Sequence, residues 1–104
     1  NFSAEVMTNF PNNEYLVENA VKLISSISSS SRYQGMPQLA CCVAPVIAAV
    51  TKYGNSNTVR VEGNHALWGL GCDPRNRIAI FADPNGVKAL ESSIYVVSAE
   101  RTLI

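Results

Sequence analysis

The stretch NTVRVEGNHALWGLGC, residues 57–72, decides the predicted fold class, because the spacing of apolar residues changes there. In TVRVE, Val59 and Val61 alternate with polar residues, which is the two-residue period of a half-buried strand. Gly63-Asn64 can form a tight turn, and HALWGLG then supplies a second strand. The sequence therefore predicts a β-hairpin here.

Three further segments have the composition of strands. Residues 1–10 alternate apolar and polar side chains up to Pro11, RIAIFA at 77–82 is mostly apolar, and SIYVVSA closes the chain. Between the last two, Asp83-Pro84 is a cap followed by a proline, and it predicts a short helix to about Ser92.

Two helices are predicted in the first half of the chain. Asn12 or Asn13 can cap a helix whose apolar residues recur at three- and four-residue steps as far as Ile27. Pro37 suits the first turn of a second helix, which Pro45 must kink or restart. Its apolar run is about 12 residues long, too short for a membrane span of about 20.

These elements predict an α+β fold: a single-domain two-layer sandwich over residues 1–104, with two or three helices on one face of an antiparallel sheet of four to five strands. No internal repeat is visible. The order of elements is similar to that of small secreted α/β proteins of fungi, including killer-toxin-like and effector proteins. Such a likeness concerns the fold and carries no function.

Composition limits the partners. Charged residues make up 15% of the chain and the formal net charge is zero, so there is no basic field for general nucleic-acid binding. A polar surface built from Ser and Asn, and a start at Asn1, fit a secreted protein whose leader has been cleaved. No metal and no cofactor are predicted.

The three cysteines are the first candidates for chemistry. Adjacent Cys41 and Cys42 could both ligate one zinc ion only with strain, and neighbouring cysteines rarely bond each other. In an oxidising compartment one of them is expected to pair with Cys72, and we expect Cys42 rather than Cys41. Such a bridge would stabilise the fold by roughly 3–4 kcal/mol. The remaining cysteine would be inert or would link two chains.

One group of residues could support catalysis. Glu62 and His65 would flank the predicted turn on one face of the hairpin, with Arg60, Arg75 and Arg77 nearby. A carboxylate, an imidazole and an arginine can act as acid and base on a phosphodiester. A solvated hairpin face accounts for the same residues.

The leading hypothesis is a small secreted protein that is not an enzyme and acts by binding a protein, glycan or membrane-surface target, as a toxin-like, effector or immune-active protein. Its contact residues would be Tyr33, Tyr53 and Trp68, and it could form a homodimer. The first alternative is a small secreted hydrolase, such as a ribonuclease using Glu62, His65 and an arginine. The second is an intracellular subunit whose apolar helix packs on a partner.

Overall fold

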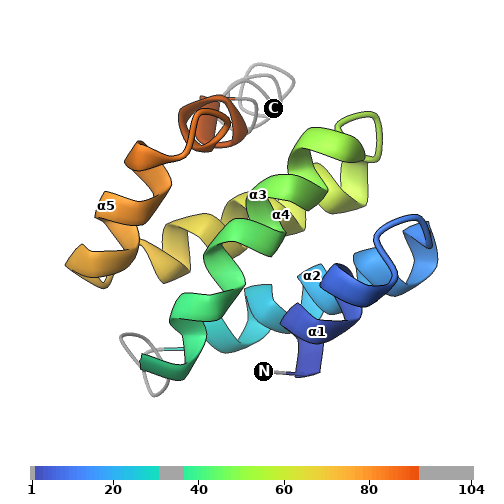
Figure 1. Ribbon diagram of the computed structural model, residues 1–104, viewed down its shortest axis with the longest axis horizontal. Coiled ribbons are helices and arrows are strands. Elements are labelled where there is room, and N and C mark those ends of the chain that lie inside the picture. Colours follow the sequence, from blue (N-terminus) through green and yellow to red (C-terminus); the bar gives the residue numbers. More distant parts are fainter. Residues whose placement is uncertain (1, 31–36, 92–104) are drawn as a thin grey trace, which may run out of the picture.

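The computed structural model describes residues 2–30 and 37–91, and this part of the chain contains helices and turns but no strand. The predicted α+β sandwich is therefore wrong, and the fold is a stack of helices (Figure 1). In chain order the elements are α1 (Phe2–Asn9), α2 (Glu14–Ser29), the 3-10 helix η1 (Pro37–Cys42), α3 (Val43–Lys52), α4 (Asn57–Leu70), α5 (Pro74–Ala82) and a helical segment over 86–91.

The predicted helix after Pro11 is confirmed as α2. Asn13 is its N-cap, and the Asn13 side chain accepts a hydrogen bond of 3.1 Å from the amide of Leu16. Its buried residues follow three- and four-residue steps, so one stripe faces the core: Val17, Ala20, Val21, Ile24, Ser25 and Ser28.

Pro45 does not kink the second predicted helix, because a new helix starts shortly before it. Residues up to Cys42 form η1, and α3 begins at Val43, which places Pro45 at the third position of the new helix. The first four amides of a helix have no acceptor within it, so the missing N–H of Pro45 costs no helical hydrogen bond.

The predicted hairpin is wrong, because residues 57–70 form the single helix α4. Ser56 is its N-cap and accepts a hydrogen bond from the amide of Val59. Gly63 is not a turn residue. A Cβ on Gly63 would lie 2.4 Å from Cγ2 of Val50, so the glycine lets α4 approach α3 closely.

The strands predicted at 1–10 and 77–82 are also wrong. In α1 the buried residues Ser3, Ala4 and Met7 have the spacing of one helix face. In α5, Asp73 is the N-cap and Pro74 the first residue, and Ile80 is buried. The helix predicted after Asp83 is present over 86–91, whereas the strand predicted at 93–99 lies outside the described residues.

Helices α2 and α4 make the most extensive contact in the molecule, and α1 and α3 lie beside them. Figure 1 shows the order of the stack, from α1 and α2 through α3 and α4 to α5. One apolar core runs through these layers, and its fully buried side chains include Val21, Ile24, Cys42, Val46, Val59, Ala66 and Leu67.

Two helix–loop–helix segments of the stack, 43 residues apart, have similar turns. The loop after α1 and the loop after α3 carry equivalent hydrogen bonds: Phe10 N to Val6 O matches Tyr53 N to Ala49 O. A second matching pair, also 43 residues apart, joins Asn13 N to Phe10 O and Ser56 N to Tyr53 O. In a third pair, the hydroxyls of Thr8 and Thr51 each donate to the carbonyl four residues earlier.

The helical segment 86–91 begins 43 residues after the start of α3. Val43 and Val46 of α3 correspond to Gly86 and Ala89, and all four residues are buried. The sequence hides this relation, because Thr8/Thr51 and Asn12/Asn55 are the only identical pairs when residues 2–30 are aligned at this step.

Candidate binding grooves

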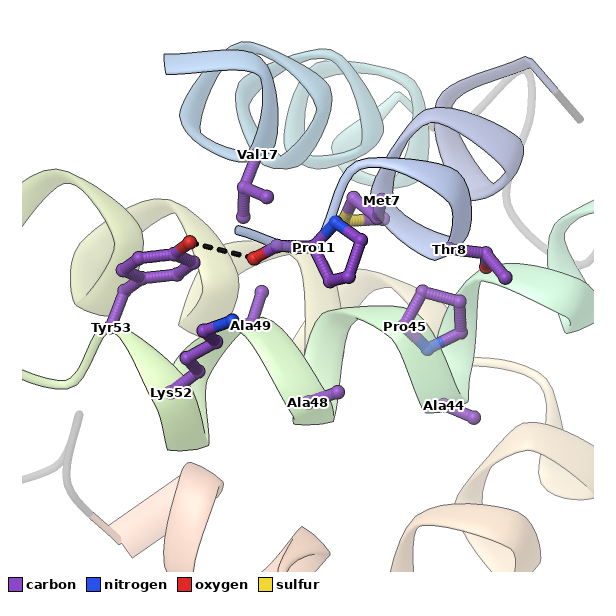
Figure 2. Close-up of a pocket in the computed structure, with 10 residues that line it drawn as sticks. All are labelled: Met7, Thr8, Pro11, Val17, Ala44, Pro45, Ala48, Ala49, Lys52 and Tyr53. Carbon is purple, nitrogen blue, oxygen red and sulfur yellow. Dashed lines mark hydrogen bonds between the residues drawn. The ribbon is translucent and has the colours of Figure 1, made fainter. Parts of the chain in front are cut away.

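An apolar groove of about 350 Å³ lies between α1 and α3 and is called groove 1 below (Figure 2). Its walls come from α1, from Pro11, from Val17 of α2 and from one side of α3. Apart from Lys52, the α3 residues that line it are small, and they are Ala44, Pro45, Ala48 and Ala49. Because these side chains are short, the two helices leave a hollow between them.

One end of groove 1 is closed by polar contacts. The hydroxyl of Tyr53 donates a 2.6 Å hydrogen bond to the carbonyl of Pro11 (Figure 2). The ammonium of Lys52 donates to Oδ1 of Asn12 and lies 5.6 Å from the centre of the Tyr53 ring. These contacts tie the end of α3 to the loop between α1 and α2, and they place one positive charge beside an apolar hollow.

A second groove, groove 2, has a volume of about 320 Å³ and lies between α3 and the helical segment 86–91. It is related to groove 1 by the same step of 43 residues. Five residues that line groove 1 each have a counterpart, 43 residues later, that lines groove 2. The pairs are Met7/Val50, Thr8/Thr51, Pro11/Gly54, Val17/Arg60 and Pro45/Lys88. The same hollow therefore appears twice along the stack.

Groove 2 differs from groove 1 in charge. Arg60 and Lys88 line it, and no carboxylate is among its described lining residues. One nitrogen of the Arg60 guanidinium, Nη2, donates to Oδ1 of Asn57. Its Nε is buried and has no hydrogen-bond partner among the described residues. Two cations with no carboxylate among the described lining residues favour an anionic group in groove 2.

The predicted catalytic residues do not converge on one cavity. Glu62 and His65 lie three residues apart on α4, the first half-buried and the second exposed, and no described hydrogen bond or ion pair joins them. Arg75 lies at the start of α5, where its guanidinium forms a 3.0 Å ion pair with Asp73. Arg77 is exposed on α5 and lines a small apolar hollow beside Trp68.

The Asp73–Arg75 contact explains the charge state at this end of α5. The hydrogen bond from the Arg75 side chain, with one from its backbone amide, lowers the pKa of the Asp73 carboxyl. The same contact raises the pKa of Arg75. Asp73 is thus held ionised as a helix cap, which is a structural task and not that of a proton donor.

Two of the three predicted contact residues lie in the described part of the chain. Tyr53 closes groove 1, and Trp68 is 56% exposed on α4. Tyr33 lies outside the described residues. The structure places Tyr53 and Trp68 on different elements, and they line different hollows.

The predicted Cys42–Cys72 disulfide is absent, and no disulfide joins any of the three cysteines within the described residues. Cys42 is buried at the junction of η1 and α3, whereas Cys72 is exposed in the turn after α4, with its thiol 3.7 Å from the carbonyl oxygen of Trp68. The prediction relied on a helix facing a sheet, and that sheet does not exist. Burial, with the adjacent Cys41, raises the pKa of Cys42 to about 12.

Among residues 2–30 and 37–91, no group of three or more His, Cys, Asp or Glu side chains is placed to hold a metal ion. No helix in the same ranges is long and apolar enough to cross a membrane. Comparison of the chain with protein-family models, with curated proteins and with solved structures finds no match.

The sequence places Arg60 in the predicted hairpin, near the candidate catalytic residues, and does not single out Lys52 or Lys88. The structure places Lys52 in groove 1, and Arg60 and Lys88 in groove 2. No local pattern could have found these cations, because they lie on three different elements.

Proposed function

We propose that this protein is a helical-repeat scaffold that binds another protein and is not an enzyme. The observation that carries the proposal is the repeat of helices, caps and grooves at a step of 43 residues. Repeats of about 40–47 residues with two or three helices build α-solenoids. Stacked units of that kind repeat the same surface along one axis, and they commonly use it to bind other proteins.

The hydrolase alternative receives less support from the geometry. An acid–base pair needs both groups directed at one position where a substrate atom can lie. Glu62 and His65 share one helix surface, and neither lines any of the hollows described above. Arg75 is engaged by Asp73 on a different element.

Secretion stays a prediction. The disulfide expected for an oxidising compartment is absent from the described residues. Free thiols are typical of reducing compartments, which favours the alternative of an intracellular subunit as the setting for the same binding role.

Selection from a displayed library of random dodecapeptides on the immobilised chain tests the proposal. We expect enriched peptides that bind the folded chain in solution and lose binding when urea unfolds it. The matched variant is Glu62→Ala/His65→Ala, which should bind the same peptides. Cleavage of a ribonucleotide oligomer by the original chain and not by this double variant would contradict the proposal.

A further inference from the structure

We propose that grooves 1 and 2 together bind one extended peptide, which places an apolar side chain in groove 1 and a carboxylate in groove 2. The inference rests on the proposed function and names the chemistry of its partner. The apolar residue and the acidic residue of this peptide are three positions apart in its sequence.

Charge identifies the group that enters groove 2. Arg60 and Lys88 face it from two different elements, and no carboxylate lines it in the described part of the chain. Asn57 accepts a hydrogen bond from Nη2 of Arg60 and so holds the guanidinium in place. A carboxylate carries the charge that complements the two cations.

Shape and polarity identify the group that enters groove 1. Short side chains of α3 and Met7 of α1 form its floor and walls, so it suits a side chain such as leucine. Its one cation, Lys52, is already paired with Asn12 and lies near the Tyr53 ring. An apolar group there needs no new polar partner.

The spacing follows from the repeat. Consecutive grooves lie on the two sides of α3, so their separation is about one helix-to-helix distance, roughly 8–10 Å. A polyproline II segment rises about 3.1 Å per residue with three residues per turn. Residues i and i+3 of such a segment therefore lie on one side, about 9 Å apart, which matches the grooves.

The test uses fluorescein-labelled peptides and the full chain. The probe is Gly-Pro-Leu-Pro-Pro-Glu-Pro-Gly, and a second probe exchanges Leu and Glu to allow for the opposite chain direction. Matched controls replace Glu by Gln or Leu by Ala. We expect at least one probe to bind, and each control to bind about tenfold more weakly, by fluorescence anisotropy.

A double-mutant cycle locates the contact. In Arg60→Gln and in Lys88→Gln, the difference between the Glu and Gln peptides should shrink or vanish, and Ala48→Trp should abolish the difference between Leu and Ala. Lys88 is exposed, so its variant keeps the test valid if Arg60→Gln unfolds. An unchanged Glu-to-Gln difference in a folded Lys88→Gln variant would overturn the assignment.

The outcome also separates this inference from the proposed function. If neither probe binds but the selected dodecapeptides do, and they change the fluorescence of Trp68 on α4, the chain is a binding scaffold that uses another surface, and the groove assignment is wrong. If no peptide of either kind binds, both proposals fail.

Discussion

The thiol of Cys42 is expected to be unreactive, whereas the exposed thiols of Cys41 and Cys72 can react. Its thiol is buried in the core, and burial raises its pKa to about 12. Because the thiolate is the reactive form, Cys42 stays protonated and unreactive near neutral pH. Cys41 and Cys72 are exposed and therefore accessible to a thiol reagent.

We therefore expect two thiols to react promptly with Ellman's reagent in the native protein and a third to react only after unfolding in urea. Cys42→Ala should remove the slow thiol and leave the two fast ones. The slow thiol should also remain protected as the pH rises from 7 to 9, since its pKa lies well above that range. Detection of one thiol and one disulfide in the native chain would show that the predicted bridge forms after all.

At the scale of an element, α4 depends on glycines for its packing. A Cβ on Gly69 would lie 2.5 Å from the carbonyl oxygen of Ser28, a backbone atom of α2 that cannot move aside by a side-chain rotation. At Gly54 the nearest atom would be 3.3 Å away, so that position is the matched control.

We expect Gly69→Ala to destabilise the protein by about 1–3 kcal/mol, because the two helices must separate to admit the methyl group. Gly54→Ala should change the free energy of unfolding by clearly less. Urea denaturation followed by circular dichroism measures both. If Gly69→Ala were as stable as the original chain, the close contact between α2 and α4 would be wrong.

The same helix shows what the sequence could and could not predict. Caps and proline positions are local signals, so the start of α2 at Asn13 and the restart at Pro45 could be predicted. Val59 and Val61 alternate like strand residues, but only Val59 reaches the core, and the buried set Val59, Gly63, Ala66, Leu67 and Leu70 has helical spacing. The glycines of α4 make this helical spacing hard to recognise in the sequence. Their positions are determined by close contact with a neighbouring helix and not by the local conformational preference of the chain.

The candidate site was harder to predict than the helices. Lys52, Arg60 and Lys88 lie on three elements, and only the packing of these elements brings Arg60 and Lys88 to one groove. No local pattern marks them. What these cations share is their position relative to the loops after α1 and α3. The sequences of the two segments differ at almost every position, so their correspondence is visible only in the helix caps and the hydrogen bonds of the loops.

At the scale of the whole molecule, a stack of equivalent units differs from a closed globular fold because each unit mainly contacts its neighbours. The stability of such a stack is approximately the sum of its units and of the contacts between them. The chain therefore offers a direct test. Residues 43–85 span one repeat step, so that residue 86 occupies the place of residue 43 in the next unit.

We expect a chain in which residues 43–85 are duplicated in tandem to fold as a longer stack. Its helical signal per residue should be retained, and its urea m-value should rise with the extra surface buried. The control duplicates residues 43–78, which breaks the register between units and should give a less stable or partly unfolded chain. Circular dichroism, urea titration and sedimentation measure these outcomes. If the in-register duplication unfolds as readily as the control, the units are not interchangeable, and both the repeat and the binding scaffold derived from it must be abandoned.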